Sequence, residues 1–374
     1  MIYLDNAATT RVLDSAVVAV ERAMRIGFYN PNATYRAGVD ASAEMERARS
    51  VIAAAIGARN DEICFTSCAT ESNNWALERG RKRIKGNVVI SAGEHASVYE
   101  PAMQLKSRGT DVRVVPLTSG GQVDCDALLD AVDKDTALVS VIHVSNETGV
   151  VNPIKKLVSA VKAKAPTAVF HSDGVQALCK LREPISSLGV DLYSASAHKI
   201  GAPKGIGFLY IHRGFGIAPL LFGGGQEKNM RSGTQNTPYI AAFAKAAEEF
   251  VNVVDIDRIG EIRSALCDFF VANGCEIVGN GQNSGFVLCV HVPKVKAEIL
   301  QSMAADNGVI VGKGSACSGS KRGNRVLGAM GLPEKTTECC IRLSFFIDTK
   351  LDDALEAARI IVDCADKIRS GHVK

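Results

Sequence analysis

The sequence predicts an α/β fold, with a large domain built on a mostly parallel β-sheet and a smaller α+β domain. Short apolar runs alternate with helical stretches over the first half of the chain, and strand–helix–strand repetition is typical of a doubly wound sheet. The runs are almost continuously apolar, as expected for strands that are covered on both faces. After about Thr237 long helices and a few strands replace this alternation, which indicates a second domain.

The predicted strands of the large domain are separated by helical stretches. Apolar runs predict strands over residues 62–67, 87–91, 112–117, 137–144, 168–173, 191–197 and 205–211. Helical patterns between them cover residues 96–109, 124–133 and 154–165. Sheets of this kind bind ligands beyond the carboxyl ends of their strands, so the residues after each strand are the first candidates for function.

The remaining segments predict the smaller domain. They are helices within 238–274, 296–307 and 352–367, and extended runs at 275–281, 285–292 and 340–347. We expect the first residues of the chain to complete this domain. The predicted large domain is therefore residues 15–250, and the small domain is residues 1–14 together with 251–374.

The composition is that of a soluble globular protein, with 47% hydrophobic and 22% charged residues. A net charge of +3 is too small to indicate a nucleic-acid or membrane-surface partner. No run of about eighteen apolar residues predicts a membrane span, and the first residues, with Asp5, do not resemble a signal peptide. The eleven cysteines lack zinc-site spacing, and most lie in apolar segments. We expect a cytoplasmic protein with reduced cysteines and no metal site.

Two charged residues follow predicted strands where charge is costly. Lys199 comes just after the strand at 191–197, and an ammonium there must be desolvated. A surface turn is one explanation, and a lysine that forms an imine is the other. Asp173 closes the strand at 168–173, where a buried carboxylate needs a partner such as a cationic ring nitrogen.

Further polar residues follow other strands, and each has an ordinary explanation. In "FTSCATESNN" a helix begins near Thr70; its N–H groups suit an anion, but Thr70 is also a normal helix cap. His95 is either structural or catalytic, and Asn146 fits a turn equally well. Together, however, a lysine, a carboxylate, a histidine and a helix start match the needs of pyridoxal phosphate (PLP).

Two more residues stand out in the second half of the chain. Cys317 lies in the Gly/Ser-rich stretch "GKGSACSGS", and the nearby Lys313, Lys321 and Arg322 would favour a thiolate. An ordinary loop cysteine is the alternative. Arg342 lies between apolar residues in "CCIRLSFF", where a guanidinium needs a carboxylate, from either a salt bridge or a substrate.

At these residues the chain resembles the cysteine desulfurases of the class V aminotransferase family, the NifS/IscS type. The likeness extends over nearly the whole chain in unbroken order. It is carried by the motifs "YLDNAATT", "TSCATESNN", "EH", "NETG", "SDGVQ", "SASAHKIGAPKGIG", "GGGQEKNMRSGTQN" and "GSACS". The resemblance implies a PLP-dependent transferase of fold type I that forms a homodimer.

The resemblance also implies a role for each matching residue. Lys199 would form the imine with PLP, His95 would stack on the ring and exchange protons, and Cys317 would attack the substrate sulfur. Asp173 would contact the pyridine nitrogen, and Gln176 the phenolic oxygen. The phosphate would be held by Ala69, Thr70, Ser196 and His198, with Thr234 from a second subunit. Asn146 and Arg342 would bind the substrate carboxylate, and Asn146 would also lie near the cofactor.

The chain departs from the family pattern at several points. Cys68 and Ala197 replace residues that are usually glycine, in the phosphate loop and beside His198. After Cys317 the chain has "KRGN" and is one residue shorter than the usual "LEPS"-like segment. "FFIDTK" replaces a more polar segment after "IRLS". The loop after Cys317 would carry sulfur, so its change concerns the acceptor more than the chemistry.

The predicted function is a PLP-dependent cysteine desulfurase. It would convert L-cysteine to L-alanine, leave a persulfide on Cys317 and pass the sulfur to a protein acceptor, as in iron–sulfur cluster assembly. No membrane or direct nucleic-acid partner is expected. The alternatives are a selenocysteine lyase, a class V aminotransferase, for which the "GSACS" loop would have no purpose, and a non-catalytic scaffold of the same fold.

Overall fold

The computed structural model describes residues 1–81, 86–314 and 324–371 and contains two separate β-sheets. The larger has seven strands in the order β2-β8-β7-β6-β5-β3-β4. These strands are β2 (Ile63–Thr66), β3 (Asn87–Ser91), β4 (Val112–Val115), β5 (Thr136–Ser140), β6 (Val169–Asp173), β7 (Leu192–Ser196) and β8 (Gly207–Ile211). Only β8 is antiparallel to its neighbours, so the predicted mostly parallel sheet is confirmed.

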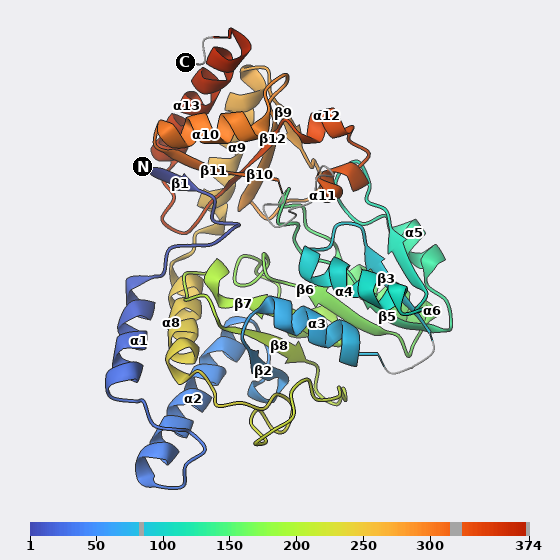
Figure 1. Ribbon diagram of the computed structural model, residues 1–374, viewed down its shortest axis with the longest axis vertical. Helices are drawn as coiled ribbons and strands as arrows, with labels where there is room; N and C mark the ends of the chain where they lie inside the picture. Colours follow the sequence, from blue (N-terminus) through green and yellow to red (C-terminus); the bar gives the residue numbers. More distant parts are fainter. Residues whose placement is uncertain (82–85, 315–323, 372–374) are drawn as a thin grey trace.

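Helices pack against the large sheet (Figure 1). They are α3 (Ala69–Arg79), α4 (Ala96–Ser107), α5 (Cys125–Ala131), α6 (Ile154–Lys164) and α7 (Ile185–Leu188). A separate group, α1 (Asp14–Arg25), α2 (Arg36–Ala55) and α8 (Thr237–Val253), extends from one end of the domain. Most residues of β3, β5, β6 and β7 are buried, which explains why their sequences are almost continuously apolar.

The smaller sheet has five strands in the order β1-β11-β12-β10-β9. They are β1 (Ile2–Leu4), β9 (Glu276–Val278), β10 (Val287–His291), β11 (Val309–Lys313) and β12 (Cys340–Ser344). The helices of this part are α9 (Ile256–Ala272), α10 (Ala297–Asp306), α11 (Arg325–Ala329), α12 (Glu334–Thr337) and α13 (Leu351–Arg369). β1 pairs with β11, so the first residues of the chain join this sheet; the boundary at residues 14 and 251 stays a prediction.

Some strands end earlier than the sequence predicts, and the reasons are local. β4 stops at Val115 because Pro116 has no N–H to offer the ladder. β5 stops at Ser140, and the N–H of Ile142 then donates to the carboxylate of Glu94 instead of to a strand. The sequence prediction did not include β11.

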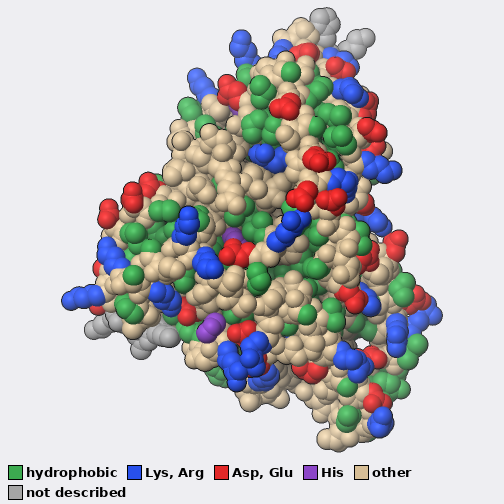
Figure 2. Space-filling model, turned by 180° about the vertical axis from the view of Figure 1, so that it is seen from behind, with side chains coloured by type: hydrophobic (Ala, Val, Ile, Leu, Met, Phe, Trp, Pro, Cys, Tyr) green, Lys and Arg blue, Asp and Glu red, His purple; other side chains and the backbone are tan. Residues whose placement is uncertain are grey.

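The two sheets share one apolar core. Phe250 of α8 packs against Phe286 and Phe346, with ring centroids 6.3 and 5.7 Å apart. Phe208 of β8 stacks on Phe243 of α8 at 5.8 Å. Acidic and basic side chains are intermixed on the surface shown in Figure 2. Among the described residues, no helix is both long and apolar enough to cross a bilayer.

Candidate active site

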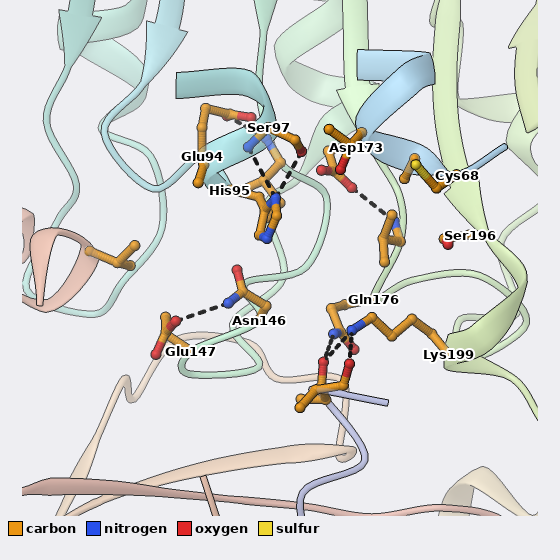
Figure 3. Close-up of a pocket in the computed structure, with 18 of the residues that line it drawn as sticks. Cys68, Glu94, His95, Ser97, Asn146, Glu147, Asp173, Gln176, Ser196 and Lys199 are labelled. Atoms are coloured by element: carbon orange, nitrogen blue, oxygen red, sulfur yellow. Dashed lines mark hydrogen bonds between the residues drawn. The ribbon is translucent and has the colours of Figure 1, made fainter. Parts of the chain in front are cut away.

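A cavity of about 350 Å³ lies at the carboxyl ends of β6 and β7 and at the starts of α3 and α4 (Figure 3). It brings together most of the residues that the sequence singled out: Ala69, Thr70, His95, Asn146, Asp173, Gln176, Ser196, His198, Lys199 and Arg342. Thr234 is exposed and does not line this cavity, whereas Cys317 lies outside the described residues. The rule that ligands bind beyond parallel strands therefore located the cavity correctly.

Lys199 ends the short 3₁₀ helix Ala197–Lys199, directly after β7. Its Nζ donates to the carbonyl oxygens of Ala7 and Ala8, both at 2.6 Å. Figure 3 shows the side chain reaching across the cavity to these carbonyls. Neutral acceptors therefore hold the amine at the cavity, although carbonyl oxygens balance a positive charge less well than a carboxylate does.

Asp173 ends β6 and is 2% exposed. Its Oδ2 accepts from Asn73 Nδ2 at 2.8 Å, and its Oδ1 accepts from the backbone N–H of Val175 at 3.0 Å. Hydrogen bonds to both oxygens stabilise the charged carboxylate in a buried place. This carboxylate can hold a cationic group in the cavity.

His95 is the N-cap of α4, and its Nδ1 accepts the backbone N–H of Ser97 at 3.2 Å. Burial lowers the pKa of His95 below the ordinary value, while Asp173 opposes the shift and Lys199 adds to it. The positive end of the helix dipole also disfavours an imidazolium here. A neutral, flat ring on the wall of the cavity suits stacking against an aromatic ligand.

The start of α3 offers backbone N–H groups to the cavity through Ala69 and Thr70. Its N-cap residue, Cys68, makes no capping hydrogen bond through its side chain. Gly207 of β8 allows this turn to approach, since a Cβ at Gly207 would lie 3.0 Å from the carbonyl carbon of Cys68. Uncapped N–H groups at a helix start form an anion site.

His198 lies on the same side as Ser196 and beside Lys199. Burial is the main cause that lowers the pKa of His198 to about 3, with Lys199 and Lys204 contributing. The imidazole is therefore neutral and acts as a hydrogen-bonding group. Its Nδ1 lies 3.2 Å from Thr9 Oγ1, and its backbone carbonyl accepts from Thr10 Oγ1 at 3.0 Å.

Gln176 is held by a residue that the sequence did not single out. Lys180 is fully buried and donates from Nζ to Gln176 Oε1 at 3.2 Å, while Gln176 Nε2 donates to the Ala7 carbonyl at 3.0 Å. The Ala7 carbonyl can only accept, so the nitrogen of the amide faces Ala7 and the oxygen faces Lys180. Burial lowers the pKa of Lys180 to about 7, and Lys199 adds to the shift.

Arg342 of β12 reaches the cavity from the smaller sheet, but carboxylates already surround it. It donates to Asp5 Oδ1 at 2.8 Å and to the carbonyl of Asn146 at 2.9 Å, and Glu147 lies 3.9 Å away. The sequence left a salt bridge and a substrate carboxylate as alternatives, and the salt bridge is present. Within the described part of the chain, the Nε of Arg342 is buried without a hydrogen-bond partner, so this guanidinium still has a donor to offer.

Sequence reasoning missed two further ionisable residues of the wall. Glu94 is completely buried, and burial raises its pKa to about 8, so it is a neutral acid at pH 7. Arg325 of α11 stacks its guanidinium on the ring of Tyr99 at 4.1 Å and donates to the carbonyls of Ala92 and Glu94. Glu94 could have been found from its place between a strand and His95. Nothing in the sequence around Arg325 indicated its contact with α4.

The donor set of the cavity fits PLP. The start of α3 suits a phosphate, Asp173 suits a protonated ring nitrogen, and the Nε2 of Gln176 suits a phenolate oxygen. Lys199 lies beside Gln176, since both side chains donate to the Ala7 carbonyl, and its amine can carry an aldehyde cofactor. A lysine, a buried carboxylate and an anion site are the groups that a fold type I PLP site requires.

The fold and the cavity define a class of protein, and comparison with known proteins agrees with it. The family model described as aminotransferase class-V matches residues 2–355. The chain belongs to this family.

Within that family the similar proteins are cysteine desulfurases. The chain is 36% identical to "Cysteine desulfurase 2" of Trichormus variabilis, over 97% of this chain and 93% of that one. It is 37% identical to a cysteine desulfurase of Sinorhizobium fredii, over 98% and 97% of the two chains. A solved "NifS-like protein" superposes with a TM-score of 0.90 at 33% identity, over 98% and 99%. The chain is therefore a member of the cysteine desulfurases.

Proposed function

We propose that this protein uses PLP, carried on Lys199, to remove sulfur from L-cysteine. The observation that carries the proposal is the single cavity in which Lys199, Asp173 and His95 meet the start of α3. The comparisons support the substrate, since the similar proteins are cysteine desulfurases and one similar structure, 28% identical, is described as "SspA in complex with cysteine".

Several of the cavity residues have a defined part in the proposed reaction. The start of α3, with Ser196 and His198, holds the phosphate, and Asp173 keeps the ring nitrogen protonated. When bound, the cofactor withdraws electrons from the substrate Cα. Arg342 and Asn146 orient the substrate carboxylate, with the free Nε of Arg342 as the available donor. The Cys317 thiolate attacks the substrate sulfur, so that L-cysteine and the thiol give L-alanine and a Cys317 persulfide.

We also propose a homodimer that works in the cytoplasm and passes its sulfur to an acceptor protein. Thr234 is exposed here, which suits a contact with the phosphate of a second subunit. The surface around α1 and α2 exposes many large apolar side chains, including Val18, Ile26, Phe28, Tyr35 and Val39. Such a patch indicates a protein–protein interface. Iron–sulfur cluster assembly is one destination that suits the sulfur.

The test of the proposed function is product release from L-cysteine. Purified protein with a reductant should release sulfide and alanine in equal amounts. Cys317→Ala should lose sulfide release to the background level and keep its PLP absorbance, because the thiol acts after cofactor binding. Cys125→Ala, at an exposed cysteine away from the cavity, is the matched control. Full activity of Cys317→Ala would overturn the persulfide step.

Lys199→Ala should abolish turnover completely. The variant loses the only side chain proposed to carry the cofactor, and with it the acceptor of the substrate proton. Lys204→Ala, at an exposed lysine in the same segment, should retain activity. Absorbance spectra measured beside the turnover assay would show whether the cofactor is still held. Residual turnover by Lys199→Ala within tenfold of the wild type would contradict the assignment.

A further inference from the structure

A chain of hydrogen bonds connects His95 to Asp173, and its protons can be assigned one at a time. Asn73 of α3 lies between the two and is 0% exposed. Its Nδ2 is 2.8 Å from Asp173 Oδ2 and 2.8 Å from Ser97 Oγ. A carboxylate accepts hydrogen bonds, so the nitrogen of the amide must face Asp173. The two N–H bonds of Asn73 are then used, one on each partner.

The hydroxyl of Ser97 is therefore available to donate a hydrogen bond. Its Oγ accepts from Asn73, and the same Oγ lies 2.8 Å from His95 Nδ1. The backbone N–H of Ser97 also donates to Nδ1, at 3.2 Å. Two donors from one residue thus point at the same ring nitrogen. A proton on Nδ1 would face the N–H of Ser97 directly, so Nδ1 must be the unprotonated nitrogen.

We propose that Ser97 is a positioning residue that fixes the neutral ring of His95 as the tautomer protonated at Nε2. Asn73 connects this arrangement to Asp173, because its amide nitrogen bonds both Ser97 and Asp173. In Figure 3 the two bonds from Ser97 meet the ring on one side, and the other ring nitrogen points into the cavity towards Asn146. His95 then presents an N–H donor to the cavity. At that atom it can donate a hydrogen bond but cannot accept a proton.

The charges around the ring do not reverse this assignment. Asp173 of β6 and Glu147 raise the pKa of His95, while Lys199 and Arg325 of α11 lower it. Burial is the largest cause and keeps the ring neutral. The consequence for catalysis rests on the proposed function: the group that takes up a substrate proton is Lys199, and His95 supplies a hydrogen bond. The position of the proton itself does not rest on the function.

The test reads the ring nitrogens directly by ¹⁵N NMR of protein labelled in its histidine side chains. The chain has seven histidines, and His95→Gln assigns the signal by its loss. In the purified wild-type holoenzyme we expect the proton on Nε2 and an Nδ1 shift typical of an unprotonated, hydrogen-bonded nitrogen. A proton on Nδ1, or an even mixture of the tautomers, would overturn the proposal.

Variants at residue 97 identify the source of the effect. Ser97→Ala removes one of the two donors to Nδ1, so the pKa of His95 should rise and the tautomers should begin to mix. Ser97→Thr keeps the hydroxyl and should restore both signatures, and Ser107→Ala at the exposed end of α4 should change neither. An unchanged pKa of His95 in Ser97→Ala would contradict the proposed role of Ser97. These spectra need no turnover, so the result is independent of whether the protein desulfurates cysteine.

Discussion

Two buried cations near the cavity have different surroundings. Arg342, on the smaller sheet, is 3% exposed and lies between the carboxylates of Asp5 and Glu147. Lys180, behind the wall of the larger domain, is 2% exposed, and no carboxylate among the described residues forms an ion pair with it. Its partners are the amide oxygen of Gln176 and the ring of Phe286, 5.4 Å from Nζ.

The difference follows from what each side chain can do with its proton. A guanidinium stays charged at any working pH, so burying it requires acids nearby. An ammonium can lose its proton, so burial lowers the pKa of Lys180 to about 7. The side of the cavity formed by the smaller sheet therefore keeps a permanent, balanced charge, whereas the larger domain holds a charge that changes near neutral pH.

The largest expected effect comes from removing the balanced cation. Arg342→Met removes the cation beside the buried Glu147 and the partly buried Asp5, which should lower the free energy of unfolding by about 3–5 kcal/mol. Urea denaturation at pH 7 measures the change. Arg182→Met breaks the exposed pair with Asp257 and should stay within about 1 kcal/mol of wild type. Equal losses of unfolding free energy in the two variants would mean that the carboxylates beside Arg342 do not contribute to the effect.

Removing the unbalanced cation should change the pH dependence of stability. The pKa of Lys180 is lowered in the folded state, so the unfolded chain binds more protons between about pH 7 and 10.5. The wild type should therefore gain stability relative to Lys180→Met as the pH rises through that window, by about 3 kcal/mol between pH 7 and 10. Denaturation of both proteins at the two pH values tests this. A difference that does not change with pH would mean that Lys180 is not desolvated.

The sequence was a good guide to the fold because burial on both faces leaves a strong pattern. The apolar runs at β3, β6 and β7 were located within one residue of their ends. The polar residues after them could be predicted to meet, because parallel strands bring their carboxyl ends to one edge. For this reason the order of residues along the chain was enough to predict that Asp173 and Lys199 share one site.

The sequence could not predict residues that act through distant partners. The acceptors of Lys199 are the carbonyls of Ala7 and Ala8, which are 192 and 191 residues away and have no side-chain chemistry to notice. Lys180 lies in a stretch with no sign that its ammonium is buried. Ser97 looks like an ordinary residue in the first turn of a helix, and its bond to Asn73 exists only when α3 and α4 pack side by side.

The contacts of the first residues, which include the acceptors of Lys199, also determine when the cavity can form during synthesis. Residues 2–4 pair with residues 309–311, and Asn6 donates to the carbonyl of Ser344, so both contacts tie the start of the chain to segments synthesised late. A ribosome makes residues 7 and 8 among the first, yet the bond from the N–H of Ala7 to Ser344 forms only when that late segment emerges. A nascent chain ending before residue 309 can form the large sheet but not the complete cavity. The cavity is thereby completed only after residue 344 has been translated.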